Sequence, residues 1–365
     1  MNKLATIEII SKIDPNPGAD RIMIASVLGY QSVIVKDSFK EGDLIIFVHT
    51  DTTIKYQEWN KFLFKKDSDI TKPLRIKNQK LRGQISQGVI FPLSIIKIDS
   101  PLLAGVDVAE VIGVEKYEAP LALELAGKAE GGYYPNRYGL SATDEENCQS
   151  SPDLLKEFNG LEVYASLKAD GSSGSFIWTG INPWHGTPSG GEFKVCSRRL
   201  TLLEDKEQGR ESLNTFWYIA NKYNLKEKLS KAGIDGYIIR GEVCSPRIQK
   251  NRLGLTEPEL FVFDFFVIHY LDGKVQQNGY ENLKETCNKL GLKTVKTIPL
   301  EGKETFIFDE KIHTLEYFQK IANELKYDNG QPAEGLVLRP ISSTYSRSLG
   351  RNLSCKFISQ NYNQD

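Results

Sequence analysis

Residues 162–178 constrain the fold of this chain most, because two β-type runs lie there on either side of a turn signal. Val163, Ala165 and Leu167 alternate with more polar neighbours, which is the period of a half-buried strand. Lys168 follows, an Asp-Gly turn signal comes next, and a second β-type run resumes at Ser175. The stretch therefore predicts a β-hairpin with a lysine at its rim, a position where a lysine is most often a solvated surface charge.

Short apolar runs separated by turn residues fill the first part of the chain. They cover residues 4–10, 22–28, 31–35, 44–48, 74–76 and 88–93. Short strands at such regular spacing predict a small β-sandwich or barrel. We therefore expect residues 1–113 to form a separate β-rich domain.

The remainder of the chain mixes both kinds of secondary structure. Helical patterns are expected at 205–223, 224–232, 282–290 and 310–325, and β-rich runs at 237–243, 259–269 and 335–340. This mixture predicts an α+β fold in which antiparallel sheets carry a cleft, over residues 160–365. Residues 114–159 show little periodicity and are expected to be a linker, ending in a capped helix that begins near Ser151 and packs on the last domain.

Composition narrows the class of protein. The 365 residues are 40% hydrophobic and 25% charged, with a formal net charge of -1. This balance is that of an ordinary globular protein and argues against a passive, charge-driven nucleic-acid binder. The five cysteines form no C-x-x-C pair, the four histidines lack metal-ligand spacing, and no apolar run has transmembrane length. We expect a soluble, intracellular protein without disulfides or zinc.

Several charged residues lie at the ends of expected strands. Arg198 and Arg199 follow one such run, and if the chain is extended there only one of them can face a cleft. Glu242 closes the Arg-Gly-Glu end of the apolar run that begins at Tyr237, where a buried carboxylate is costly unless it meets a cation or a metal. Phe261, Phe263 and Phe265 would share one face of a strand, a pattern that is more often core than ligand platform.

These segments occur in an order that resembles the covalent nucleotidyltransferases, the class of ATP-dependent DNA and RNA ligases and messenger-RNA capping enzymes. The matching phrases are Lys168-x-Asp170-Gly, Ser197-Arg198, Arg240-Gly-Glu242, the aromatic run around Phe263, Glu334-Gly-Leu-Val and the segment around Lys356. The resemblance is closest to RNA ligases typified by the Deinococcus and Naegleria nick-sealing enzymes, which carry an OB-type module in front. DNA ligases and capping enzymes place their OB domain after the last motif, whereas here nine residues follow Lys356.

The resemblance implies a role for each matching residue. Lys168 would attack the α-phosphate of ATP to form lysyl-AMP, and Leu167 would belong to the same nucleotide site. Phe263 would stack on the base and Lys356 would bind the α-phosphate. Arg198, in preference to Arg199, would lie on the ribose and phosphate side, and Glu242 would contact the ribose. Asp170, Glu242 and Glu334 would hold Mg²⁺ or Mn²⁺ through water.

Two residues depart from the family pattern. Asn147 stands where an arginine is common, and Ser354 stands where the fifth motif has the first lysine of Lys-x-Lys. Each departure removes a cation that the family places on a phosphate. An inert RNA-binding protein on a ligase scaffold is therefore one alternative to an active ligase, and a capping-type guanylyltransferase is another.

The front module also carries a basic segment. The candidate basic face comprises Lys72, Arg75, Lys77, Lys80 and Arg82, and Lys77, Lys80 and Arg82 are the predicted RNA-binding residues. The same pattern suits the solvated face of an edge hairpin. The expected partner is RNA with 5'-phosphate and 3'-hydroxyl ends, joined at a nick in a duplex during RNA repair by a monomeric enzyme.

Overall fold

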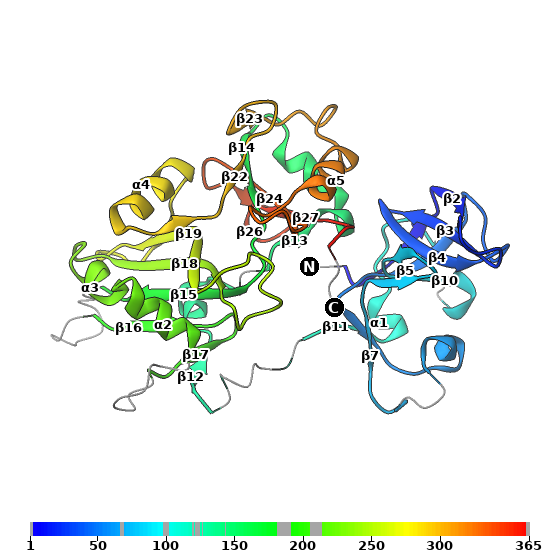
Figure 1. Ribbon diagram of the computed structural model, residues 1–365, viewed down its shortest axis with the longest axis horizontal. Helices are drawn as coiled ribbons and strands as arrows, with labels where there is room; N and C mark the ends of the chain where they lie inside the picture. Colours follow the sequence, from blue (N-terminus) through cyan, green and yellow to red (C-terminus); the bar gives the residue numbers. More distant parts are fainter. Residues whose placement is uncertain are drawn as a thin grey trace.

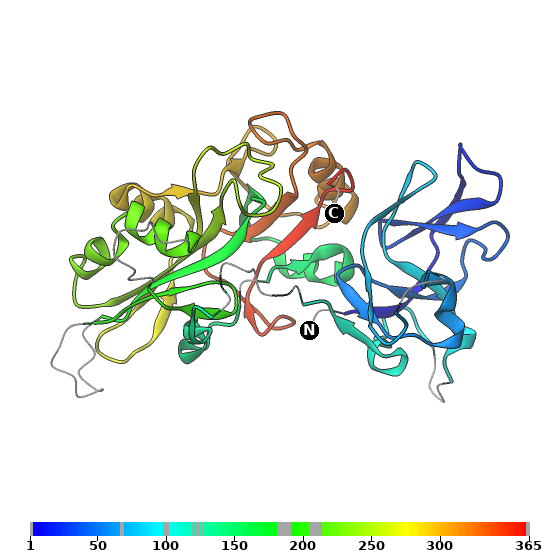
Figure 2. The same ribbon diagram turned by 60° about the horizontal axis from the view of Figure 1, so that its bottom comes forward.

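The computed structural model describes residues 3–65, 69–97, 102–118, 120, 125, 127–142, 144–180, 191–204 and 214–362. A β-rich amino-terminal unit lies beside a larger unit built on two sheets (Figures 1 and 2). The described part contains no helix that is both long and apolar enough to cross a membrane.

The amino-terminal unit consists of short antiparallel strands around a central β5. One sheet has the order β1 (Ala5–Ile9), β5 (Leu44–Val48), β10 (Val89–Pro92), and a second has β2 (Lys12–Pro15), β3 (Ile22–Val27), β4 (Tyr30–Val35). A third has β11 (Val114–Lys116), β6 (Thr52–Ile54), β7 (Leu74–Ile76), and a hairpin joins β8 (Gln79–Leu81) to β9 (Gln84–Ser86). Three short helices complete it: η1 (Glu58–Leu63), η2 (Leu93–Ile95) and α1 (Ala109–Ile112).

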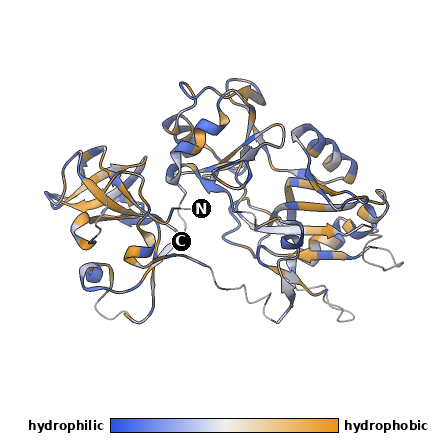
Figure 3. Cartoon of the chain, turned by 180° about the vertical axis from the view of Figure 1, so that it is seen from behind, coloured by the Kyte–Doolittle hydropathy of each residue, from blue (hydrophilic) through white to orange (hydrophobic). Residues whose placement is uncertain are grey.

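Successive residues of β5 serve two hydrophobic cores. Ile46 and Val48 belong to one buried cluster, whereas Ile45 and Phe47 belong to another on the opposite face. Because side chains alternate along a strand, a central strand that is apolar throughout is buried on both faces. The strands of this unit are accordingly coloured hydrophobic over much of their length in Figure 3. The predicted β-rich domain in the first part of the chain is confirmed.

The segment expected to be a linker adds strands to three sheets. Its elements are β11, β12 (Ala129–Gly132), η4 (Tyr134–Tyr138), β13 (Glu146–Asn147), η5 (Cys148–Ser150) and η6 (Pro152–Phe158). β11 pairs with β6, β12 with β17 and β13 with β27. The helix expected near Ser151 is a 3₁₀ helix, and the Ser151 hydroxyl donates to Glu146 instead of capping it. The boundaries at 113 and 159 stay predictions.

The larger of the two remaining sheets has eight strands. Its order is β12, β17 (Leu200–Leu202), β16 (Phe193–Cys196), β15 (Ser172–Trp178), β18 (Gly236–Cys244), β19 (Glu259–Ile268), β20 (Val275–Gln277), with β21 (Lys293–Thr294) beside β19. Three helices supply apolar residues to the core on one face of this sheet: α2 (Thr215–Lys222), α3 (Leu225–Ser230) and α4 (Tyr280–Leu290). Apart from the parallel pair β19–β21, its strands are antiparallel.

The second sheet has six strands and is backed by one helix. Its order is β13, β27 (Cys355–Ile358), β24 (Gly335–Pro340), β14 (Glu162–Leu167), β22 (Thr297–Ile298), with β23 (Thr305–Ile307) also on β14. α5 (Leu315–Glu324) packs on one face through Phe318 and Ala322. A hairpin of β25 (Tyr345–Ser346) and β26 (Arg351–Asn352) lies between β24 and β27 in the chain.

The predicted hairpin at 162–178 is wrong. Both runs are strands, but β14 belongs to the six-stranded sheet and β15 to the eight-stranded sheet. Each already has strand neighbours on both edges, so the two cannot pair with one another. The chain crosses between the sheets at Gly171, where a Cβ would come within 2.6 Å of the Val243 carbonyl oxygen. Lys168 therefore lies at the junction of two sheets.

The helix predictions are confirmed within a few residues where the structure describes them. α2 begins at Thr215 because the Asn214 side chain caps it, and residues 205–213 of that prediction lie outside the described residues. α5 begins at Leu315, five residues later than predicted, because Thr314 accepts a hydrogen bond from the Tyr317 amide.

Candidate active site

A cleft of about 840 Å³ lies between the two sheets and the amino-terminal unit. Its floor is one face of the six-stranded sheet. Asn147, Lys356, Val337 and Ser166 lie in one row across four adjacent strands, and all four line the cleft. Residues that stand directly opposite one another on neighbouring strands share a face. Strand pairing thus gathers residues that are up to 209 positions apart in the sequence.

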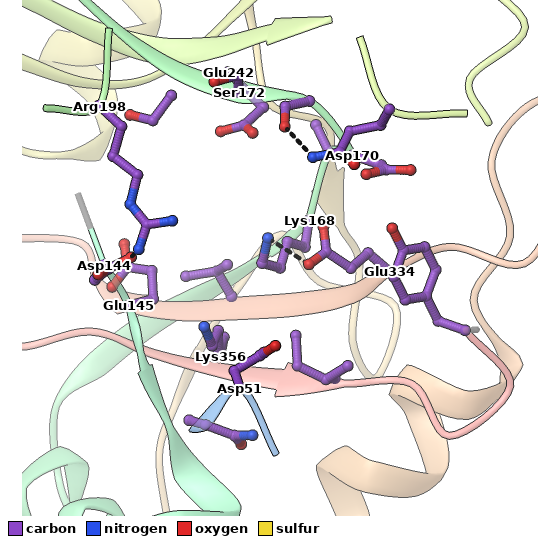
Figure 4. A pocket seen from close by; sticks show the side chains of 18 of the residues that line it. Asp51, Asp144, Glu145, Lys168, Asp170, Ser172, Arg198, Glu242, Glu334 and Lys356 are labelled. Carbon is purple, nitrogen blue, oxygen red and sulfur yellow. Dashed lines mark hydrogen bonds and ion pairs between the residues drawn. The ribbon is translucent and has the colours of Figure 1, made fainter. Parts of the chain in front are cut away.

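Lys168 occupies the end of β14, just where the chain leaves the floor. Its Nζ lies 2.8 Å from Glu334 Oε1, as the dashed line in Figure 4 marks. Its carbonyl oxygen accepts a hydrogen bond from the Tyr327 hydroxyl, which in turn accepts one from the Glu334 amide. Burial lowers the pKa of Lys168, but the carboxylates of Glu334 and Glu242 outweigh burial and raise the pKa to about 12. The lysine is held in place and kept charged.

Gly335 allows β24 to lie close against β27 next to Glu334 and Lys356. Its φ is 146°, and a Cβ at this position would lie 1.9 Å from the Phe357 carbonyl oxygen. Only glycine accommodates that contact and that backbone conformation together. The glycine of the Glu-Gly motif therefore has a packing role.

Asp170 and Glu242 complete an acidic group around Lys168 (Figure 4). Burial raises the pKa of Glu242 to about 8, and Glu334 and Asp170 add to this rise. Burial, followed by the charge of Glu334, also raises the pKa of Asp170. Asp170 Oδ2 is buried without a hydrogen-bond partner among the described residues, and Arg252 Nε lies 3.7 Å from it.

This donor set suits a hard divalent cation, because Mg²⁺ and Mn²⁺ prefer carboxylate oxygens. Asp170 Oδ2 has no hydrogen-bond partner among the described residues, and burial together with neighbouring carboxylates raises the pKa of Asp170 and Glu242, so a bound cation would offset their charge. Within the described ranges no three acidic, histidine or cysteine side chains are grouped closely enough to enclose an ion alone. Asp170, Glu242 and Glu334 would therefore share an ion with water or phosphate oxygens.

Both arginines of the Ser-Arg-Arg segment line the cleft, so the expectation that only one can face it is wrong. The reason is a tight turn between β16 and β17, in which the Ser197 amide donates to the Leu200 carbonyl oxygen at 2.9 Å. Arg198 forms an ion pair with Asp144, and Arg199 Nη1 lies 2.7 Å from Glu118 Oε2.

Asp144 therefore holds Arg198, the arginine that the resemblance favours as a ligand contact. Its carboxylate also binds Lys116 Nζ at 2.6 Å. Burial acts to raise the pKa of Asp144, but Arg198 and Lys116 outweigh it and hold the pKa well below its usual range. An anionic ligand of Arg198 would have to compete with this carboxylate.

The three phenylalanines of β19 do not share one face. The pairing of β18 with β19 skips one residue, so Phe263 is the extra residue of a β-bulge. A bulge reverses which residues face each side of a strand. Phe265 is consequently buried in the core under the helices, whereas Phe263 lines the cleft with the Arg339 guanidinium 5.5 Å from its ring centroid.

Lys356 and Leu167 also line the cleft. Burial, and then the charge of Lys168, lowers the pKa of Lys356. Figure 4 shows Asp51 of the amino-terminal unit beside Lys356. The structure thus brings together all nine residues that the resemblance placed in the nucleotide and metal sites: Leu167, Lys168, Asp170, Arg198, Arg199, Glu242, Phe263, Glu334 and Lys356.

Comparison with known proteins identifies the family. A model of the RNA ligase family matches residues 161–358, and a model of an OB-fold domain matches residues 4–93. The chain belongs to the RNA ligase family. No curated protein matches the chain.

Solved structures also support the membership of this chain in the RNA ligase family. A structure of Naegleria gruberi RNA ligase with PPi is 26% identical, has a TM-score of 0.74, and covers 99% of this chain and 98% of that one. A mutant of that protein with ATP and Mn is 25% identical with a TM-score of 0.74, covering 98% and 97%. Another mutant with AMP and Mn is 25% identical with a TM-score of 0.75, covering 99% and 98%.

The two departures from the family pattern have structural partners in this ligase. Asn147 Nδ2 donates to the Tyr30 hydroxyl at 2.8 Å, which links the floor to the OB fold. Ser354 donates to Glu145, whose carboxylate also pairs with Arg339. Although burial opposes it, Glu145 raises the pKa of Arg339, which remains charged.

Sequence reasoning missed Arg339, a buried cation of the cleft. It lies two residues after Val337 on β24, so the period-2 rule applied to the fourth motif would have indicated it. Asp144, Glu145, Arg252 and Tyr362 were also missed, and they come from loops or strand ends without a periodic signal.

The predicted RNA-binding residues of the OB fold lie elsewhere. Lys77, Lys80 and Arg82 are exposed and do not line the cleft. Lys72 forms a 3.3 Å ion pair with Asp69. The role of the first three residues in binding RNA stays a prediction.

Proposed function

We propose that the protein is an ATP-dependent RNA ligase that works through a lysyl-AMP intermediate. The Nζ lone pair of Lys168 bonds to the α-phosphorus of ATP while the bond to the bridging oxygen of pyrophosphate breaks. AMP then passes to an RNA 5'-phosphate, and a 3'-hydroxyl attacks that phosphate and releases AMP. The observation that supports this most is the position of Lys168 in a cleft, among three carboxylates and two cations, Lys356 and Arg198.

Each step needs groups that the cleft contains. Lys168 must lose its proton to water before it attacks, and a cation that offsets the charge of Glu334 and Glu242 would lower the pKa that these carboxylates raise. Lys356 and Arg198 are positioned to bind phosphate oxygens, and Phe263 and Val337 line the same cleft as apolar contacts for the base. A divalent cation held by Asp170, Glu242 and Glu334 would supply positive charge that offsets both the carboxylates and the triphosphate.

The proposed substrate is based on the membership of this chain in the RNA ligase family. We infer that the ligase joins 5'-phosphate and 3'-hydroxyl RNA ends at nicks in a duplex, as a monomer in RNA repair. The OB fold contributes Asp51, Arg75 and Asn78 to the lining of the cleft beside the floor, which supports a substrate larger than a mononucleotide. Capping with GTP and passive RNA binding are the alternatives that an experiment should separate.

The first test is labelling with α-³²P-ATP or α-³²P-GTP in Mg²⁺ or Mn²⁺, followed by denaturing electrophoresis. We expect ATP to label the native protein and Lys296→Ala, whose exposed lysine pairs with Asp328 at the surface, but not Lys168→Ala. Adding a nicked 5'-phosphate duplex should remove the label and yield a sealed strand. Label on Lys168→Ala would reject the nucleophile, GTP labelling would indicate capping, and no label would leave the passive binder.

A further inference from the structure

One wall of the cleft comes from the OB fold and contains an arginine stacked on an aromatic ring. Arg75 Nη2 donates to Asp51 Oδ1 at 2.7 Å, and its guanidinium carbon lies 3.9 Å from the centroid of the Tyr117 ring. All three residues line the cleft. Because Asp51 lies beside Lys356, this wall adjoins the predicted α-phosphate contact (Figure 4).

Two polar atoms of this wall have no hydrogen-bond partner among the described residues. They are Arg75 Nε, a donor, and Asn78 Oδ1, an acceptor, and both atoms are buried. An unpaired buried polar atom is costly and calls for an explanation. A donor and an acceptor left unpaired in one wall match a ligand that offers both kinds of group.

Charge on the wall also suits a nucleic acid. Lys3, Arg75 and Lys116 line the cleft, and the carboxylates nearest to two of them are offset by pairing, Asp51 with Arg75 and Asp144 with Lys116. Arginine and aromatic side chains are the usual platforms on which OB folds stack the bases of a strand. A ribose 2'-hydroxyl can both donate and accept, and it distinguishes RNA from DNA.

We propose that Arg75, Asn78 and Tyr117 form a nucleotide subsite for the RNA strand that is being sealed. A base stacks against the Arg75–Tyr117 pair, and the ribose 2'-hydroxyl of that nucleotide bonds to Asn78 Oδ1 and Arg75 Nε. The subsite lies inside the cleft, away from the exposed Lys77, Lys80 and Arg82. This inference rests on the proposed ligase function and adds the surface by which the OB fold contacts RNA.

The test compares Tyr117→Ala and Asn78→Ala with two controls, Tyr117→Phe, which keeps the ring, and the outer-hairpin variant Lys80→Ala/Arg82→Ala. Labelling with ATP should be unchanged in all of them, which also shows that each variant folds. For sealing of a nicked RNA duplex, we expect KM to rise about tenfold in Tyr117→Ala and Asn78→Ala and to stay constant in Tyr117→Phe.

Single 2'-deoxy nucleotides placed in turn beside the nick test the ribose contact. One position should raise KM for the native enzyme but not for Asn78→Ala. Native KM values for sealing in Tyr117→Ala and Asn78→Ala, with a raised KM in Lys80→Ala/Arg82→Ala, would overturn the subsite in favour of the outer hairpin. Absence of labelling in the native protein would instead reject the ligase function itself.

Discussion

At the scale of single residues, Glu242 lies in surroundings that disfavour its charge. It lies in β18 just before the buried Val243 and Cys244, and Glu334 and Asp170 add negative charge beside it. Burial raises its pKa from 4.5 to about 8. Because folding raises this pKa, the protonated Glu242 carboxyl favours the folded state over the unfolded one. Its contribution to the free energy of unfolding is fully present below pH 4.5 and is lost as the pH rises through 8.

We therefore expect Glu242→Gln to stabilise the metal-free protein increasingly as the pH rises. The gain in Tm over the native protein should be larger at pH 9 than at pH 5, because glutamine cannot ionise. Scanning calorimetry in the presence of a chelator measures this difference. Glu324→Gln, which changes an exposed carboxyl at the end of α5, serves as the control. An equal gain at both pH values would contradict the proposed cost of ionisation.

At the scale of secondary-structure elements, the β-bulge of β19 separates two phenylalanines of the same strand by function. Phe265 is 3% exposed and packs in the core of the eight-stranded sheet, whereas Phe263 lines the cleft. The bulge lies opposite Arg240 and Gly241 of β18. It re-aims one aromatic side chain while the strand on either side remains paired.

Substitution by alanine should separate the two roles. Phe265→Ala should lower the free energy of unfolding by about 3–5 kcal/mol, because it leaves a cavity in the core. Phe263→Ala should cost far less stability but raise KM for ATP in the labelling reaction about tenfold, as loss of stacking on a base does. Urea denaturation and initial labelling rates measure the two effects. Equal losses of stability in the two variants would place Phe263 in the core.

At the scale of the whole molecule, a buried polar network joins the OB fold to the catalytic unit. The Tyr30 hydroxyl accepts from Asn147 and contacts Ser150 Oγ at 3.2 Å, and His49 Nδ1 lies 3.2 Å from the same Ser150 oxygen. Burial lowers the pKa of His49 to about 3, so this histidine is neutral at physiological pH. Asn147 thus serves the contact between the two units that form the cleft.

Tyr30→Phe should weaken this contact and leave the OB core packed. Removal of the hydroxyl leaves Asn147 Nδ2 without its acceptor, at an expected cost of about 1–3 kcal/mol. Limited proteolysis should then cut between residues 114 and 159 faster than in the native protein. Tyr345→Phe, at a side chain that is 65% exposed, is the control. Unchanged cleavage in Tyr30→Phe would show that the network does not hold the units together.

Local pattern and motif order determined much of this protein from the sequence. The mixed fold, the front OB domain, the approximate helices and nine residues that line the cleft all follow from them. Alternation along a strand specifies which side chains share a face, and a motif specifies which chemical groups are present. Strand alternation and motif content can both be read without knowing which strands pair with one another.

Only the tertiary structure decided which strands pair and where their irregularities lie. It separated β14 from β15, placed Phe263 in a bulge, turned both Arg198 and Arg199 to the cleft, and gave Ser354 a partner in Glu145. The charge state of Lys168 likewise depends on Glu334, 166 positions away in the chain. Strand pairing and electrostatics act between groups that are close in space, and local sequence does not encode those distances.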